Sequence, residues 1–527
     1  MKKIVVLFLI AIMLMATVVG CTVDTSVENV ARDDLVMAIG SEPDGGFDPC
    51  TGWGRYGNPL FQSTLIDTDK NMGIIYDLAT EYSISEDGLT WTFKLREDAF
   101  FTDGEQVTAE DVVFTFETAK NSGSIVDLTN MESIKKLDDF TIEFKLHKPD
   151  LSFTYTVVAT GIVPKHAYDP NYGENPIGSG PYTLAQWDKG QQIVMLANEN
   201  YYGDIPEIKK VTILFLSEDA ALAVAKAGQA DVVAVTPDLA NQSIPNMELK
   251  SLESIDNRGL VLPYVNEQGK NNMGFDVGNN VTSDIAIRRA LSYGIDREAF
   301  VRDVLNGYGR PAFTECDGMP WGNEEAIVEY DTEKAKKILG DAGWIDSDDD
   351  GIRERGGLKA EFNLLYSASD STRQALATAT SLQAEELGIK INIEGTSWDV
   401  IDQRMYKDAV LMGWGTQNPI ETYLLYHSDN MGKDYYNPEN FSNDKVDEYI
   451  DMAMSSKDLD ESYEYWKKVQ WDGSAGVSTE GESPWVWLVN VDHLYYVREG
   501  LDIGEQKIHP HGHAWPLVAN LKHWKWN

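Results

Sequence analysis

Residues 85–96 read SEDGLTWTFKLR, and this stretch carries a pattern on which much of the chain is built. From Trp91 to Arg96 apolar and polar residues alternate, which predicts a strand with one buried face. Asp87-Gly88 predicts a turn before it and Asp103-Gly104 another after it. Thr108, with Asp111 three residues later, predicts the start of a helix. The segment therefore reads as strand, turn and helix.

Strands and helices are also expected on both sides of this segment. Further strands are expected at 35–39, 141–146, 181–184, 193–196, 231–235 and 389–393. Helices are expected at 220–227, 333–339 and 375–387, and one longer helix from Ser283 or Asp284 through Leu305. No solenoid repeat is present in the sequence. The expected architecture is α/β or mixed α and β, rather than all-helical or all-β.

The first residues predict export from the cytoplasm. Lys2 and Lys3 precede an uncharged apolar run, residues 4–19, that is short for a membrane span and typical of a signal peptide. The junction Val18-Val19-Gly20-Cys21 resembles a lipobox, which makes Cys21 the expected lipidation site. The polar residues 22–33 then form a tether. We expect a body anchored by lipid to the extracytoplasmic face of the cell membrane.

Size and charge narrow the function class. The 527 residues exceed what one hydrophobic core usually serves, so two or more domains are expected. The 85 acidic and 44 basic residues give a net charge of −41, which repels nucleic acid and anionic lipid and keeps the protein soluble. Besides Cys21 the chain has Cys50 and Cys316, which we expect to form a disulfide or serve structurally, with free thiols or soft metal ligands as alternatives.

Several segments together resemble one family, the family 5 extracellular solute-binding proteins that serve peptide and nickel ABC importers. The matching segments run in family order along nearly the whole mature chain: 85–96, 101–104, 109–112, 163–166, 178–182, 287–297, 330–335 and 342–344. The resemblance implies a large two-lobed fold of the periplasmic-binding-protein type, with a hinge and an extra subdomain on lobe 1. It also implies, as partners, an ABC permease and its ATPase, and a monomeric receptor.

The expected division of the chain follows from the same resemblance. Residues 1–20 are the signal peptide and 21–33 the lipid-anchored tether. Lobe 1 takes 34–65 and 178–265, with an inserted subdomain at 66–177. Lobe 2 takes 266–492, and 493–527 returns to lobe 1.

The loop 413–419, Gly-Trp-Gly-Thr-Gln-Asn-Pro, bears on the ligand. In peptide receptors of this family the loop after a Gly-Trp pair usually offers an aspartate to the peptide's amino terminus, and here Asn418 stands near that place. A neutral amide cannot balance an ammonium ion in a dehydrated cleft. The loop is similar to that of the nickel-binding subgroup, so Trp414 and Asn418 are expected to line the ligand site.

Three of the chain's eight histidines lie in residues 507–516, KIHPHGHAWP. The segment resembles the C-terminal region of nickel-type receptors, in which a histidine reaches the metal. Imidazole suits nickel, copper and zinc and releases them reversibly. We expect His511 and His513 as metal ligands with His427 as a third, although histidines near a C-terminus are often surface residues. His509 and His523 are expected at the surface.

If the metal arrives bound to a small chelator, the protein also needs side chains that bind the chelator. Arginine binds carboxylates through a planar fork, and Arg55, then Arg404, are the candidates. The aromatic residues expected to form the apolar walls, each of which could instead be packed in the core, are Trp53, Tyr56, Trp398, Trp414 and Trp515.

Asp346, Asp348 and Asp350 imitate the start of a calcium loop. The twelfth position, however, is Gly357 instead of glutamate, so we expect an acidic turn that holds calcium loosely if at all.

No motif of an enzyme is found, whether a Gly-x-Ser-x-Gly elbow, a His-Glu-x-x-His zinc helix, a Walker loop or a Rossmann fingerprint. The resemblance implies a binding protein that needs no cofactor and carries a nickel or related metal chelate, with a di- or oligopeptide as the alternative ligand. A lipoprotein that reports to a sensor is a third alternative.

Overall fold

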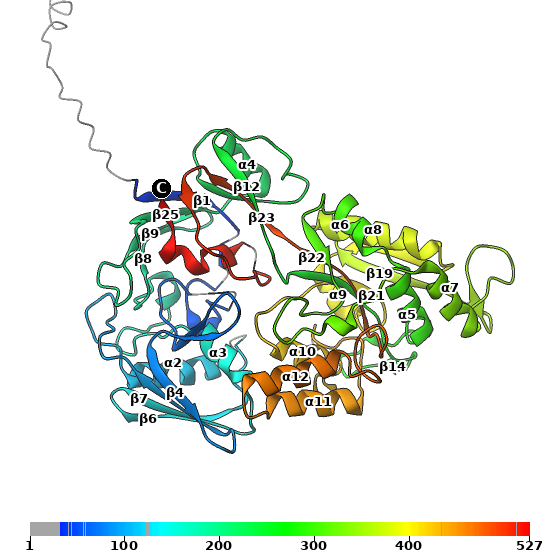
Figure 1. The fold of residues 1–527 in the computed structure, drawn as a ribbon, viewed down its shortest axis with the longest axis horizontal. Coiled ribbons are helices and arrows are strands. Elements are labelled where there is room, and N and C mark those ends of the chain that lie inside the picture. The colour runs from blue at the N-terminus through cyan, green and yellow to red at the C-terminus, as the bar shows by residue number, and fades with distance from the viewer. Residues whose placement is uncertain are drawn as a thin grey trace, which may run out of the picture.

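The computed structural model describes residues 32–40, 42–43, 45–55, 57, 59–122, 126–433, 435–512 and 514–527. The predicted signal peptide, Cys21, most of the tether, Tyr56 and His513 lie outside these residues. The described part folds into a mixed α and β structure with two lobes (Figure 1). We call lobe 1 the part built on a seven-stranded and a four-stranded sheet, and lobe 2 the part built on a six-stranded sheet. The expected fold class is confirmed.

The seven-stranded sheet of lobe 1 has the order β12-β23-β11-β1-β10-β9-β8. β1 pairs in parallel with β10 and β11, and the other pairs are antiparallel. Leu35 and Met37 of β1 are buried in a cluster completed by Trp524 from the C-terminal segment. The strands are β1 (Asp34–Ala38), β8 (Tyr182–Asp188), β9 (Gln192–Ala197), β10 (Lys210–Leu214), β11 (Val232–Val235), β12 (Met247–Leu252) and β23 (His493–Arg498), and α4 (Glu218–Lys226) packs on β11.

The four-stranded sheet of lobe 1 is antiparallel, in the order β4-β5-β7-β6. Trp91 and Phe93 of β5 are fully buried, as the alternation in this segment predicts. The helix α2 begins where expected, because Asp111 accepts hydrogen bonds from the backbone and hydroxyl of Thr108, each 2.9 Å long. The elements are β4 (Ala79–Ile84), β5 (Thr90–Leu95), α2 (Ala109–Asn121), β6 (Met131–Asp138), β7 (Thr141–Leu146) and α3 (Phe153–Ala159).

The six-stranded sheet of lobe 2 has the order β16-β22-β13-β21-β19-β20, with β19 parallel to β20 and β21. Its strands are β13 (Asn257–Val261), β16 (Gly309–Pro311), β19 (Glu361–Ser367), β20 (Lys390–Thr396), β21 (Ala409–Met412) and β22 (Trp485–Val491). The helices of the lobe are α5 (Ile285–Gly294), α6 (Arg297–Asp303), α7 (Thr332–Asp341), α8 (Ser371–Glu385), α9 (Trp398–Arg404), α10 (Ile420–Tyr426), α11 (Asp444–Met454) and α12 (Leu459–Gln470).

The single helix expected from Ser283 or Asp284 to Leu305 is wrong, because the chain forms two helices there. The first, α5, is capped by Asp284, and the second, α6, by Asp296, which accepts a hydrogen bond from Ala299 N at 2.9 Å. Ile295 and Asp296 have extended backbone and interrupt the helix. The apolar stripe continues across this break, and therefore the pattern alone did not reveal it.

Smaller elements complete the fold. The short strands are β2 (Ile66–Thr68), β3 (Ile74–Tyr76), β14 (Gly269–Lys270), β15 (Asp276–Val277), β17 (Glu354–Arg355), β18 (Leu358–Lys359), β24 (Leu501–Asp502) and β25 (Lys525–Trp526). No helix among the described residues is both long and apolar enough to cross a membrane.

Cys50 and Cys316 are free thiols buried in separate clusters, so the expected disulfide does not form.

Two segments connect the lobes, and both lie beside the histidine-rich end of the chain. Residues 253–256 lead from β12 to β13, and residue 492 leads from β22 to β23. The two segments are bonded together, since Val491 N donates to Asp256 O at 2.9 Å. In Figure 1, β22 and β23 run across the gap between the two halves of the molecule. The lobes also touch away from this hinge, where Tyr155 on α3 bonds to Tyr463 on α12 at 2.6 Å between hydroxyl oxygens.

Candidate functional site

A cavity of about 780 Å³ lies between the lobes. This volume falls in the range that small-molecule ligands occupy. Lobe 1, lobe 2 and the C-terminal segment all contribute to its walls, in the ranges 54–72, 126–131, 150–159, 413–436 and 506–520. Four of the predicted site residues line it: Arg55, Trp414, Asn418 and His511.

The histidine-rich segment is held by backbone hydrogen bonds between the hinge and the loop 413–418. His509 accepts from Ile255 N at 2.8 Å and donates to Glu253 O at 2.9 Å. His511 N donates to Gly415 O at 2.7 Å. These bonds fix the course of residues 509–511 along the cavity wall, although the segment belongs to neither main sheet.

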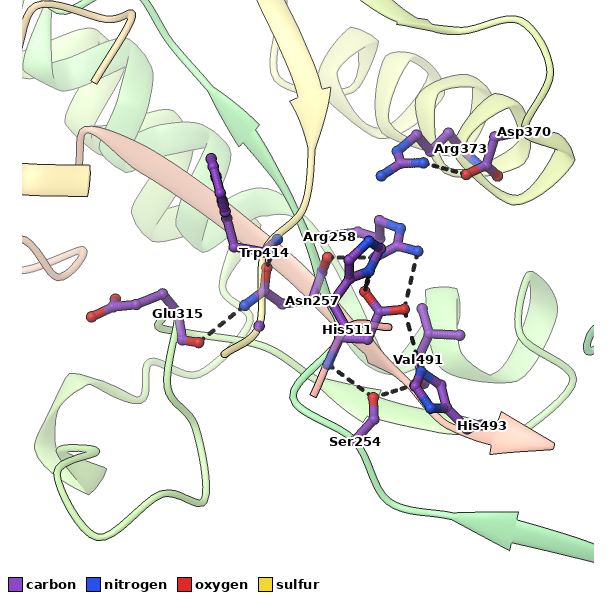
Figure 2. Close-up of polar contacts among 12 residues, drawn as sticks. Ser254, Asn257, Arg258, Glu315, Asp370, Arg373, Trp414, Val491, His493 and His511 are labelled. Carbon is purple, nitrogen blue, oxygen red and sulfur yellow. Dashed lines mark hydrogen bonds and ion pairs between the residues drawn. The ribbon is translucent and has the colours of Figure 1, made fainter. Parts of the chain in front are cut away.

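The His511 side chain lies against a buried carboxylate. Its Nδ1 atom is 2.8 Å from Oδ1 of Asp256, which is 7 % exposed and stands in the first hinge segment. Arg258 forms a salt bridge to Asp256, and His493 Nε2 lies 3.5 Å from its Oδ2. Figure 2 shows His511, Arg258 and His493 converging from three segments of the chain. Burial alone would raise the pKa of Asp256, but Arg258 and His511 outweigh it and hold this pKa well below its ordinary value.

The sequence led us to expect His509 at the surface, but the structure buries it. Its side chain is 2 % exposed, and its Nδ1 is 3.1 Å from Nδ1 of His493. Burial and the neighbouring His493 lower the pKa of His509 well below its ordinary value, which keeps this ring neutral. His523, by contrast, is exposed as expected.

The loop 413–418 forms a wall next to His511. Trp414 stacks on Tyr436, with ring centroids 5.4 Å apart and planes 20° apart, and its backbone nitrogen donates to the Asn257 side chain at 2.8 Å. Gly415 has φ +138°, and a Cβ there would lie 2.2 Å from Ile255 O, so this close approach requires glycine. Asn418 turns its side-chain oxygen to Ile420 N at 2.9 Å and thereby supports the start of α10.

Glu421 is a cavity residue that the sequence reasoning missed. It lies on α10, is 5 % exposed, and accepts a hydrogen bond from Gly415 N at 3.1 Å. Burial raises the pKa of Glu421 well above its ordinary value, and the nearby carboxyl of Glu315 adds to this. No salt bridge to Glu421 forms within the described part of the chain. Burial therefore favours the protonated form of Glu421.

Trp53 and Trp515, two of the expected wall residues, lie outside the cavity lining. Their rings pack edge to face with centroids 5.1 Å apart, and both contact the cluster around Phe47. Pro516, directly after Trp515, does line the cavity. Trp53 and Trp515 therefore pack behind the residues that line the cavity and do not face a ligand.

The structure does not bring His427, Trp398 or Arg404 to the cavity lining. The His427 side chain is 8 % exposed at the end of α10, where it packs on Tyr423 at 5.0 Å and accepts from Asp429 N. Trp398 packs against Tyr435 with centroids 5.8 Å apart. Arg404 forms salt bridges to Glu394 and Asp408, each at 2.8 Å.

The acidic turn also differs from expectation. Asp346 and Asp348 come together with Glu354, with ligand atoms within 4.8 Å of one another, whereas Asp350 pairs with Lys359. The expected trio including Asp350 is therefore wrong. Exposed acidic groups of this kind are common, and nothing else in the structure points to an ion there.

Comparison with known proteins gives the family. The model of "Bacterial extracellular solute-binding proteins, family 5 Middle" matches residues 73–436. Protein XP55 of Streptomyces lividans is 32% identical over 489 residues, which cover 90% of this chain and 86% of that protein. Oligopeptide-binding protein AppA of Bacillus subtilis is 28% identical over 77% of this chain and 78% of its own length.

Solved structures agree with the fold described above. NikZ from Campylobacter jejuni, in complex with Ni(L-His), superposes with a TM-score of 0.77 at 25% identity, covering 94% of this chain and all of NikZ. AppA from Bacillus subtilis with a bound nonapeptide gives a TM-score of 0.69 at 24% identity, with the same coverage. Members of this family are solute-binding proteins and not enzymes. The chain belongs to the family 5 bacterial extracellular solute-binding proteins and is the substrate-binding protein of an ABC importer.

Proposed function

We propose that this protein captures a chelate of nickel, or of a related transition metal, in the cavity between its lobes and delivers it to the permease. The observation that carries the proposal is the contact of 2.8 Å between His511 Nδ1 and the ionised, buried Asp256. Metal-binding imidazoles almost always turn their second ring nitrogen to a carboxylate, a carbonyl or water. With Nδ1 engaged by Asp256, His511 would bind a metal through Nε2.

Cationic side chains at the cavity suit the remaining part of such a ligand. Arg55 and Lys433 both line the cavity of a protein whose net charge is −41. Small metal chelators carry carboxylates, and guanidinium and ammonium groups bind them through charge-assisted hydrogen bonds. Trp414 and Tyr436 add an apolar surface against which a flat chelate can pack. The similarity to NikZ, whose complex contains Ni(L-His), supports the same assignment.

A peptide is the second candidate, and Glu421 favours it. A carboxyl at the loop 413–418 is what the ammonium group of a peptide needs, and Glu421 supplies one although Asn418 does not. The relatives named for oligopeptide binding are in line with this alternative. The ammonium would have to draw the proton from Glu421, whose pKa is raised by burial.

Isothermal titration tests the proposal. Wild-type protein receives nickel alone, nickel with free histidine, nickel with a tricarboxylate chelator, and a pool of di- to pentapeptides. His511→Ala is compared with His147→Ala, which changes an exposed histidine of the four-stranded sheet domain. Chelate binding that is lost in His511→Ala and kept in His147→Ala is the expected result. Binding of peptides without any nickel binding would replace the proposal with the peptide alternative.

We also propose that the mature protein is a monomer anchored through lipidated Cys21 to the outer face of the cell membrane. The lipobox-like junction and the polar residues after it support this. Cys21→Ser should move the protein from the membrane fraction to the soluble fraction. Retention of the variant in the membrane fraction would contradict the anchor.

A further inference from the structure

We propose that Asp256 is the positioning residue of the ligand site: it fixes which ring nitrogen of His511 faces the cavity and ties that nitrogen to the hinge. The part concerning metal affinity rests on the proposed function, whereas the orientation of the ring does not. Among the described residues, Asp256 is the carboxylate within hydrogen-bond distance of His511. It does not line the cavity itself, so it acts through His511.

The contact is geometrically constrained on both sides. The His511 backbone is fixed by its bond to Gly415 O at 2.7 Å, and the Asp256 backbone by its bonds to Ser254 Oγ and Val491 N, each 2.9 Å long. The Nδ1···Oδ1 distance of 2.8 Å is that of a charge-assisted hydrogen bond. These bonds restrain both backbones and keep the Nδ1 edge of the ring within hydrogen-bond distance of Asp256.

Arg258 determines which kind of hydrogen bond Asp256 can form with His511. Its side chain is 8 % exposed and binds Asp256, and the guanidinium only donates hydrogen bonds. The carboxylate is thus kept as an acceptor, and His511 must donate from Nδ1 when its ring is neutral. A carboxylate that accepts from Nδ1–H makes the opposite nitrogen, Nε2, a better electron donor. Nε2 is the atom that a ligand in the cavity would meet.

The other oxygen of Asp256 faces the second hinge segment. His493 Nε2 lies 3.5 Å from Oδ2, and His493 Nδ1 lies 3.1 Å from Nδ1 of the buried His509. His493 is the first residue of β23, directly after the crossing at residue 492. Asp256 therefore joins the cavity-lining imidazole to both crossing segments, as Figure 2 shows for the residues around it. A rotation of the lobes about the hinge changes the position of His511 only together with Asp256.

Asp256→Leu is the informative variant because it removes the acceptor and keeps a side chain of similar size. Asparagine would not serve, since Arg258 Nη1 and His511 Nδ1 both contact Oδ1 of Asp256, and an amide oxygen held there by Arg258 would still accept from His511. With no acceptor opposite Nδ1, the ring proton should move to Nε2, the tautomer that a free neutral imidazole prefers. The matched control is Glu253→Gln in the same hinge segment, whose side chain is 78 % exposed and does not contact His511.

The test has two readouts on the purified protein. The first is the protonated ring nitrogen of His511, read at pH 8 from long-range 1H–15N correlations of protein labelled with 15N-histidine and assigned with His511→Gln. We expect Nδ1–H in wild type and in Glu253→Gln, and Nε2–H in Asp256→Leu. The second is nickel–histidine affinity, which we expect to fall about 10- to 100-fold in Asp256→Leu and less than about twofold in Glu253→Gln.

Each outcome bears on a different claim. An unchanged Nδ1–H signal in Asp256→Leu overturns the positioning role, whether or not any metal binds. A changed signal with unchanged nickel affinity overturns the link between ring orientation and coordination. If wild type binds no nickel, the proposed function fails, and the NMR readout still decides the role of Asp256. Should Asp256→Leu leave Arg258 unpaired and fail to fold, Asp256→Leu/Arg258→Met removes both buried charges and is read by the same criteria.

Discussion

Asp256 and Glu421 are two buried carboxyl groups that flank the same loop, residues 413–415, and their pKa values are shifted in opposite directions. Asp256 lies between Arg258 and His511, which hold its pKa well below the ordinary value despite burial. Glu421 has the backbone of Gly415 and the carboxyl of Glu315 for neighbours, and burial raises its pKa well above the ordinary value. Burial is similar at both places, so the partner decides the charge.

This difference separates the two candidate ligands. On the Asp256 side, a fixed negative charge supports an imidazole that can bind a metal cation. On the Glu421 side, the raised pKa opposes the ionisation that an ammonium group would need. The proposed chelate uses the first group as it stands, whereas a peptide amino terminus at the loop requires Glu421 to give up a proton.

The largest expected effect concerns Glu439, another buried carboxyl group of lobe 2 whose pKa is raised. It is fully buried next to Trp485, and burial raises its pKa from the ordinary 4.5 to about 8. The folded chain keeps this proton up to about pH 8 while the unfolded chain releases it near pH 4.5, so the free energy of unfolding falls as pH rises between these values. From pH 5 to pH 8 this group should cost roughly 3 kcal/mol.

Denaturant unfolding at pH 5 and pH 8 measures that loss. Glu439→Gln should reduce it by most of this amount, whereas Glu448→Gln, at an exposed position on α11, should leave it unchanged. Equal pH dependence in wild type and Glu439→Gln would show that Glu439 is ionised when buried.

The second effect compares two of the three histidines expected as ligands, His511 and His427. His511→Ala should weaken nickel–histidine binding at least about 100-fold, or about 2.7 kcal/mol. His427→Ala should change it less than about twofold, because His427 lies outside the cavity lining. Calorimetric titration of both variants measures this. A large loss of affinity in His427→Ala would place the metal at α10 instead.

The third effect uses Glu421→Gln, which replaces a carboxyl group whose pKa is raised by a neutral amide of the same shape. We expect nickel–histidine affinity to change less than about threefold, because His511, and not Glu421, is the proposed ligand. Tripeptide titrations on the same samples sharpen the test. If tripeptides bind wild type and lose more than about tenfold in the variant, Glu421 is ionised when the cavity is filled.

The smallest effect concerns the two arginines. Arg55→Ala should weaken chelate binding about fivefold, ~1 kcal/mol, because Arg55 lines the cavity but is exposed to screening. Arg404→Ala should leave affinity unchanged, because Arg404 lies outside the cavity lining. Equal affinities for both variants would remove Arg55 from the site.

Local sequence patterns predicted the elements of the fold well. The alternation around Trp91 and the capping pair Thr108 and Asp111 give a strand and a helix where expected. The alternating pattern and the capping pair each involve residues that are close together in the sequence. The break at Ile295 and Asp296 escaped because two helices with a common buried face share one apolar stripe.

The site was predicted less completely, since it depends on contacts far apart in sequence. His511 was found from its neighbours, but Asp256 is 255 positions away and stands in no motif. Glu421 also escaped, because one glutamate among 85 acidic residues gives no signal until its burial is known. Trp398 and Arg404 are near the loop 413–418 in sequence, yet the structure packs them away from the cavity lining.

Anomalous scattering at the nickel edge tests the central claim most directly, on crystals grown with nickel and free histidine. The account predicts one strong peak in the cavity, at bonding distance from Nε2 of His511, with Nδ1 still on Asp256. A peak elsewhere, or a cavity filled by peptide with no metal, would contradict it.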